Sequence, residues 1–131
     1  MKKLLCLMLA LGTLAGCSSN DEKQRQLELM ASNRAGVLSA GLPLEYGPLK
    51  ILRVSPRKNV VEMMMIYNDS AKGAKPLQQV LNTSIYSYCK SEEVIKQLNM
   101  GLLYRIKIRN SRGQLMTDEL ISAQTCQAKK K

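Results

Sequence analysis

Four cysteines are the residues of this chain whose spacing points most directly to chemistry. One of them ends the sequence Leu14-Ala15-Gly16-Cys17, which follows two lysines and an apolar run over residues 4–14. The pattern is typical of a bacterial lipobox, in which the chain is cut before the cysteine and the thiol takes a diacylglycerol. A transmembrane anchor is the alternative, but a hydrocarbon core of roughly 30 Å requires about 20 apolar residues. We therefore predict a signal peptide over residues 1–16 and lipidation of Cys17.

The remaining cysteines predict a disulfide. Cys6 leaves with the signal peptide and Cys17 carries lipid, so that only Cys89 and Cys126 remain. Two cysteines in an oxidising periplasm are expected to pair, and two free buried thiols are the less favoured alternative. The chain has no histidine and no CxxC pair, so we expect no metal site.

Few residues are suited to catalysis. Histidine, the commonest general base, is absent, and no serine lies in a GxSxG context. Five carboxylates could form a catalytic pair in space, but their spacing in the sequence does not show one, and exposed carboxylates on a loop or strand are the normal case: Glu45, Glu62, Asp69, Asp118 and Glu119. We expect no enzyme and no cofactor.

Size and charge favour one small basic domain. Cleavage leaves 115 of the 131 residues and removes two of the twenty Lys and Arg residues but no acidic ones, so the formal charge falls from +10 to +8. The basic residues are scattered, and the chain has no Phe or Trp and only five Tyr for base stacking, which argues against a nucleic-acid partner.

The residues around the lipobox predict the location. Ser18 and Ser19 follow the lipidated cysteine, where an Asp commonly retains bacterial lipoproteins in the inner membrane. We therefore expect the lipoprotein sorting machinery to deliver the chain to the periplasmic face of the outer membrane. Residues 17–24 are polar and predict a flexible lipidated tether, residues 25–128 a single domain, and residues 129–131 a basic tail.

Periodicity predicts an α+β fold in the order αββα(α)ββ. We expect helices packed on one face of an antiparallel sheet of about four strands, with one disulfide joining the main helix to the end of the last strand. The expected elements are a helix over about 21–40, strands over 49–54 and 60–67, helices over 77–89 and 91–98, and strands over 102–109 and 114–122. The clearest strand alternates strictly between apolar and basic positions, and its antiparallel return brings Asp118 and Glu119 near the basic face.

Methionines suggest a binding surface. Flexible, polarisable thioethers suit surfaces that adapt to apolar helices, although for any single Met a core position is the more probable interpretation. We predict that the strand residues Met63, Met64 and Met65, together with Met30 and Val37 of the first helix, contribute to a partner-binding groove.

The mature chain resembles the β-type pilotin lipoproteins of type II secretion. The most specific similarity runs from Tyr88-Cys89 through residues 100–114 to Thr125-Cys126, where the family also has a strand, a turn and a second cysteine. Residues 27–34 and 42–49 look similar too.

This resemblance implies a non-enzymatic, lipid-anchored escort. Such a protein binds the C-terminal helix of the secretin subunit and targets it to the outer membrane for assembly of the multimer. Charged residues at the rim of the groove, such as Arg34 or Arg105, would set register and association rate. The alternative is a periplasmic inhibitor or another envelope-associated binding lipoprotein, which would require no apolar groove.

Overall fold

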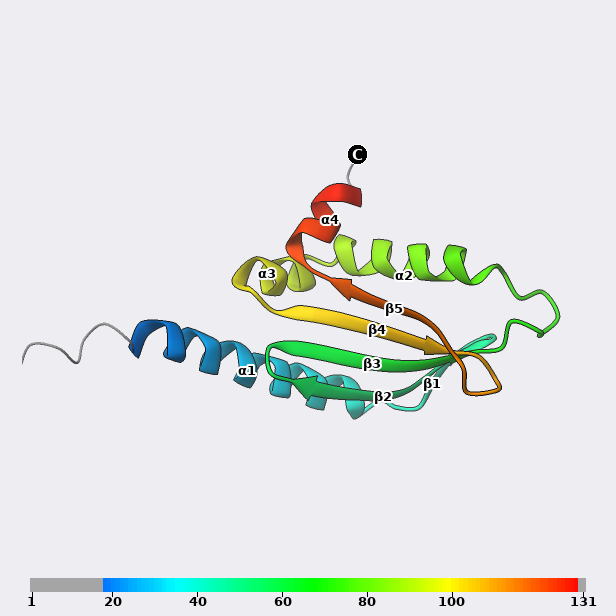
Figure 1. Cartoon of the computed structure of the whole chain (residues 1–131), viewed down its shortest axis with the longest axis horizontal. Helices are drawn as coiled ribbons and strands as arrows, with labels where there is room; N and C mark the ends of the chain where they lie inside the picture. Colours follow the sequence, from blue (N-terminus) through cyan, green and yellow to red (C-terminus); the bar gives the residue numbers. More distant parts are fainter. Residues whose placement is uncertain (1–17, 130–131) are drawn as a thin grey trace, which may run out of the picture.

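The computed structural model describes residues 18–129 and the side chains of residues 20–128, and it shows a five-stranded sheet with helices (Figure 1). The strands lie in the order β1-β2-β3-β4-β5. In chain order the elements are α1 (Ser18–Ser39), β1 (Leu44–Tyr46), β2 (Leu49–Arg57), β3 (Val60–Tyr67), α2 (Leu77–Lys90), α3 (Glu92–Met100), β4 (Leu103–Arg109), β5 (Leu115–Ile121) and α4 (Ala123–Lys129). The predicted α+β class is confirmed.

Two predicted properties of the sheet are wrong. The sheet has five strands because the three-residue strand β1 pairs with β2, and its exposed residues carry no alternation that would reveal a strand. The sheet is also mixed, since β3 and β4 are parallel while the other pairs are antiparallel. The reason is the α2–α3 connection, which returns the chain to the end of the sheet where β3 began.

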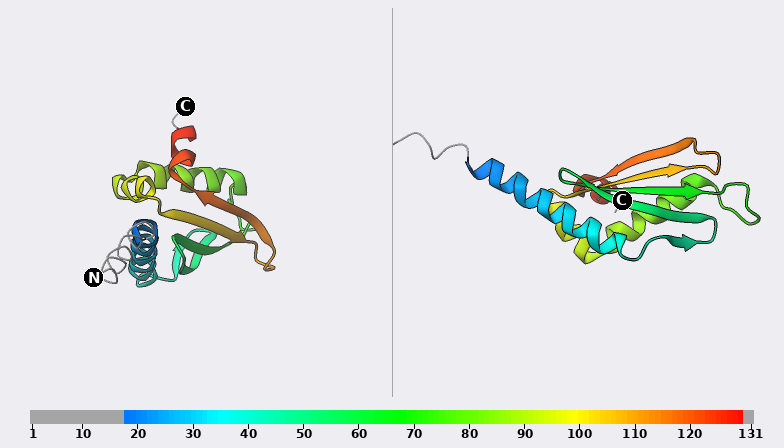
Figure 2. Two further views of the ribbon diagram at one scale, coloured as in Figure 1. Left: turned by 60° about the vertical axis from the view of Figure 1, so that its left-hand side comes forward. Right: turned by 90° about the horizontal axis from the view of Figure 1, so that it is seen from below.

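One face of the sheet carries the core. The buried positions of β4 are Tyr104, Ile106 and Ile108, each 0% exposed, and the positions between them are only partly buried. Figure 2 shows α1, α2 and α3 on one side of the strands. The predicted packing of helices on one sheet face is therefore confirmed, and within residues 18–129 no helix covers the opposite face.

Helix α1 packs against β2 and β3 through small residues. Leu27, Ala31 and Ala35 follow one another at four-residue steps and are buried, and the two alanines allow the helix to approach the sheet closely. The Ser39 hydroxyl donates a hydrogen bond of 2.9 Å to the Val54 carbonyl and fixes the end of the helix to β2. Residues 18–24, which we expected as a flexible tether, form the first turns of α1 instead.

The disulfide joins the elements that follow the sheet. Cys89 near the end of α2 is bonded to Cys126, with an S–S distance of 2.02 Å and a Cα–Cα distance of 5.3 Å. The predicted pairing is confirmed, but its position needs a correction, because Cys126 lies in the short helix α4 rather than at the end of the last strand.

Several predicted features lie outside the described residues. These are the signal peptide over residues 1–16, the lipidation site Cys17 and most of the basic tail. Within residues 18–129, no helix combines the length and apolar character needed to span a membrane.

Candidate functional site

A cavity of about 710 Å³ opens between α2 and the strands β1, β2 and β3. Its volume falls within the roughly 300–1,000 Å³ typical of ligand sites. The lining residues come from four elements and the connecting loops: Tyr46, Pro48, Leu49, Ile51, Met65, Tyr67, Gly73, Lys75, Val80, Thr83, Ser84, Ser87 and Tyr88. We call this cavity the groove.

The floor of the groove is apolar because two neighbouring strands present their core-side residues to it. Ile51 of β2 lies opposite Met65 of β3, and Leu49 lies opposite Tyr67. Met65 and Tyr67 are each only 3% exposed. The Tyr67 hydroxyl donates a hydrogen bond to the Lys75 carbonyl, which holds the segment before α2 against the floor.

The wall of the groove is one flank of α2. Val80, Ser84 and Tyr88 recur at four-residue spacing and are partly buried, whereas Leu81 and Ile85 are fully buried beneath them. We had predicted a helix over residues 77–89 but had not identified it as part of a site. The sequence does carry a signal for the site, because the apolar face of this helix is wider than the two buried positions, Leu81 and Ile85, require.

Tyr88 lines the groove as a neutral hydrogen-bond donor. Its hydroxyl donates to the Met63 sulfur at 2.8 Å, and its ring lies 5.3 Å from that of Tyr104 between centroids. Burial raises the pKa of Tyr88 to about 12, and the nearby charge of Arg34 only partly opposes this rise. The phenol is therefore protonated at physiological pH.

The rim carries exposed groups from β1 and α1. Tyr46 is 61% exposed at the edge of the groove. On α1, Met30, Arg34 and Val37 share one flank by their spacing, and Arg34 reaches Glu93 of α3 at 3.5 Å. Arg34 therefore faces α3, whereas Val37 on the same flank is 67% exposed.

The three consecutive methionines of β3 have different surroundings. Met63 is 2% exposed and belongs to the core, while Met65 lies on the floor of the groove. Met64 points to the opposite face of the sheet and is partly buried there. Of the five methionine and valine positions predicted for partner binding, Met65 lines the groove and Met30 and Val37 lie on the flank of α1.

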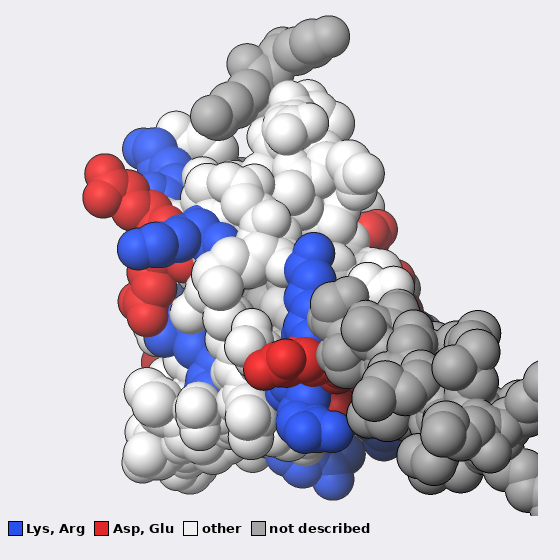
Figure 3. Space-filling view, turned by 90° about the vertical axis from the view of Figure 1, so that its left-hand side faces the viewer, with Lys and Arg blue, Asp and Glu red and all other residues white. Residues whose placement is uncertain are grey.

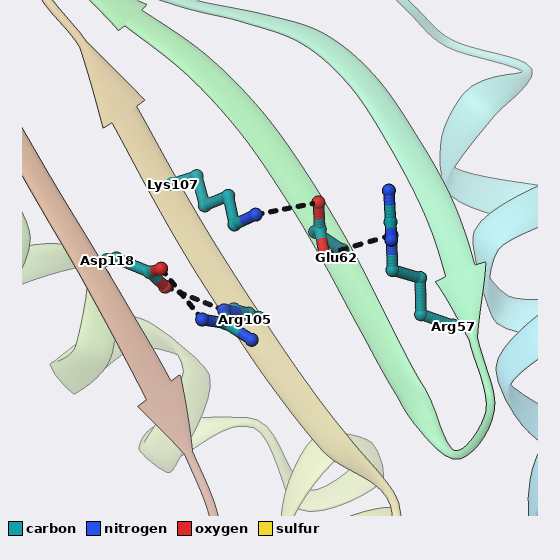
Figure 4. A network of polar contacts seen from close by, with 5 residues as sticks. All are labelled: Arg57, Glu62, Arg105, Lys107 and Asp118. Carbon is teal, nitrogen blue, oxygen red and sulfur yellow. Dashed lines mark hydrogen bonds and ion pairs between the residues drawn. The ribbon is translucent and has the colours of Figure 1, made fainter. Parts of the chain in front are cut away.

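The uncovered face of the sheet carries a network of ion pairs (Figure 4). Glu62, 8% exposed, accepts contacts from Arg57 at 3.3 Å and Lys107 at 3.4 Å. Two nitrogens of Arg105 donate to the two carboxylate oxygens of Asp118, each at 2.7 Å. This hydrogen bonding lowers the pKa of Asp118, and the predicted approach of Asp118 to the basic face is confirmed. The network holds three cations and two carboxylates, so most of its charge is neutralised within the chain and a formal charge of +1 remains.

Charges of both signs are also mixed at the end of the molecule from which α1 begins (Figure 3). Such mixing differs from the continuous basic surface that a nucleic-acid backbone requires. Among the described residues, no three His, Cys, Asp or Glu side chains form a group able to hold a metal ion.

Comparison with known proteins gives one family and a consistent set of structures. Residues 23–126 match the family described as type II secretion system (T2SS) pilotin, S protein. No curated protein sequence matches the chain.

Two similar solved structures are pilotins from Vibrio. EpsS, the type 2 secretion pilotin of Vibrio vulnificus, is 67% identical with a TM-score of 0.77, over 82% of this chain and 97% of that one. AspS, the type II secretion pilotin of Vibrio cholerae, is 50% identical with a TM-score of 0.75, over 82% of this chain and 98% of that one.

A third structure, from Pseudomonas aeruginosa, shares the fold at 17% identity and a TM-score of 0.68, over 79% of this chain and 96% of that one. The family match spans most of the sequence and agrees with both Vibrio structures. The chain therefore belongs to the S-protein family of type II secretion system pilotins.

Proposed function

We propose that this pilotin binds the C-terminal helix of its type II secretin subunit in the groove and escorts the subunit to the outer membrane for assembly. The observation that carries the proposal is the open apolar groove between α2 and β1–β3 in a chain of the pilotin family.

The chemistry of the groove suits an amphipathic helix. Its floor is apolar, with Ile51 and Met65 at the centre, and its outer edge carries an exposed aromatic side chain, Tyr46. An apolar helix face would cover this surface, and the flexible Met65 thioether adapts to the shape of the side chains it meets. The periplasmic inhibitor considered as an alternative requires no such groove.

Lipidation of Cys17 would target the protein to the membrane. The proposed anchor precedes α1 directly, and residues 20–26 of that helix are exposed. Because α1 extends beyond the sheet at its N-terminal end (Figure 1), its first turns would act as a stiff spacer between the membrane and the groove. In this proposal the sorting machinery carries the lipidated pilotin, with the secretin bound, to the periplasmic face of the outer membrane.

Calorimetric titration of the domain that begins after Cys17 tests the groove. The titrant is a peptide from the C-terminus of the same bacterium's type II secretin. We expect micromolar or tighter binding with a negative heat-capacity change, because apolar surface is buried. A folded domain that binds no peptide at high micromolar concentration would overturn the proposal.

Two tyrosine variants locate the site. Tyr46→Ala removes an exposed ring at the rim of the groove and should weaken binding by about tenfold or more, since buried aromatic anchors dominate such interfaces. Tyr86→Ala is the matched control, because Tyr86 is 54% exposed on α2 outside the groove and stacks with Lys90. Equal affinities for the two variants would place the peptide elsewhere.

Two cysteine variants test the anchor separately. Cys17→Ala should abolish incorporation of a labelled fatty acid and leave a folded domain that still binds the peptide. Cys6→Ala should retain the label, because Cys6 belongs to the predicted signal peptide. Continued lipid labelling of Cys17→Ala would contradict the proposed acceptor.

A further inference from the structure

Arg34 is a cation whose hydrogen-bonding capacity is incompletely used within the described residues. Its side chain is 19% exposed, and its Nε is buried without a hydrogen-bond partner among the described residues. Its ion pair with Glu93 is a single contact of 3.5 Å, and the Glu93 side chain is 66% exposed. The guanidinium also forms a side-chain hydrogen bond with Tyr104. A guanidinium has five N–H donors, so part of this capacity, including the buried Nε, remains available to another acceptor.

Arg105, in contrast, has a bidentate carboxylate partner within the chain. Arg105 forms two hydrogen bonds of 2.7 Å with Asp118 on the uncovered face of the sheet. It lies on the side opposite the groove and already has a bidentate carboxylate. Of the two arginines that we predicted for the rim, only Arg34 faces the side where a partner helix would lie.

The positive charge of Arg34 acts on a residue that lines the groove. It lowers the pKa of Tyr88, a lining residue, and that of Tyr104, against the larger effect of burial on each phenol. Arg34 also lies on the flank of α1 shared with Val37, which is exposed and unused by the core. Among the described residues, the acidic side chain that pairs with Arg34 is Glu93.

We infer that Arg34 binds a carboxylate of an Asp or Glu side chain on the helix held in the groove. The inference rests on the proposed function and names the polar contact of that same site. A helix lying along the groove would remove water from Arg34, and a cation that loses its water requires a charged partner. Apolar contacts alone leave the helix free to slide by a turn, whereas one bidentate ion pair fixes its register.

The test combines protein and peptide variants in calorimetric titrations. Arg34→Gln should weaken binding of the secretin peptide by about tenfold or more. Arg34→Lys should cause a smaller loss, because lysine keeps the positive charge but cannot form the bidentate contact of a guanidinium. Arg25→Gln is the matched control, because Arg25 lies on the exposed side of the same helix and should bind as the wild type does.

On the peptide side, each Asp and Glu is replaced in turn by its amide. We expect one position whose replacement causes the same loss as Arg34→Gln and causes no further loss when both changes are combined. The same position should account for the salt dependence of binding. The single peptide replacements use the wild-type pilotin, so the loss at one acidic position and its salt dependence can be measured even if Arg34→Gln unfolds, and Arg34→Lys then serves in the combined titration.

Three outcomes would overturn the inference. Wild-type affinity in a folded Arg34→Gln variant would show that Arg34 makes no contact, and additive losses at every acidic peptide position would show that no carboxylate is its partner. In both cases a loss of binding in Tyr46→Ala would leave the groove proposal standing. A wild-type domain that binds no peptide would instead overturn the groove proposal and the Arg34 inference together.

Discussion

Removal of the disulfide should lower the stability of this domain by a large fraction. Cys89 and Cys126 are 37 residues apart, and the chain-entropy model gives a crosslink of this span a stabilisation of about 4 kcal/mol at 25 °C. The total stability of such a domain is about 5–15 kcal/mol. Each kcal/mol corresponds to about 4 °C in a domain of this size, so the melting temperature should fall by about 15 °C.

The assay is thermal unfolding followed by circular dichroism for three samples. These are the oxidised wild type, the wild type in reductant and the double variant Cys89→Ala with Cys126→Ala. The reduced wild type isolates the crosslink, because it retains both sulfur atoms in the core. The variant should melt slightly lower still, since Cys126 is 2% exposed and truncation to alanine removes a buried atom.

The structure also predicts where the reduced protein loosens first. Helix α4 has seven residues, too few for a stable isolated helix, and the disulfide ties it to α2. Amide hydrogen exchange in residues 123–129 should therefore accelerate more than exchange in β4. Melting temperatures within 2 °C of one another in all three samples would refute this reasoning.

Three further predictions concern pH and backbone conformation. Because burial raises the pKa of Tyr88 in the folded state, its contribution to stability should be complete below about pH 10 and lost as the pH rises through about 12; Tyr88→Phe should flatten denaturant-measured stability over that window. Asp118 has a lowered pKa in the folded state, so its small contribution should be present above about pH 4 and lost in more acidic solution, and Asp118→Asn should remove that dependence in urea titrations. Gly101→Ala should destabilise the protein by about 1–2 kcal/mol, because φ is +113° and the added Cβ would lie 3.1 Å from a leucine of α1, whereas Gly36→Ala, with open space around it in a helix, should stabilise it by about 0.5–1 kcal/mol. Equal denaturation midpoints for the two glycine variants would contradict the account of the helix end.

Local patterns in the sequence determined the elements and their chemistry. Strict alternation over residues 103–109 identified β4 and its buried face, because successive side chains of a strand point to opposite sides. The helix predicted over residues 91–98 begins at a serine, and the Ser91 side chain caps α3 by accepting the Val94 N–H. The disulfide followed from counting the cysteines left after processing, and the family from residues that span the mature chain.

The tertiary structure alone decided how these elements meet. Alternation in β3 placed Met64 on the face opposite to that of its neighbours, but it did not show which strand lies beside β3 or in which direction that strand runs. The parallel pairing with β4 depends on how two helices cross the sheet. The groove arises only because α2 and β1 line the same cavity, and β1 is too short and too exposed to be detected in the sequence. Arg34 likewise meets its partners only in the fold, because Glu93 of α3 and Tyr104 of β4 are both far from it in the sequence. Sequence periodicity specifies which face of an element is apolar, whereas contacts between residues far apart in the chain decide which apolar faces are covered and which remain open to a partner.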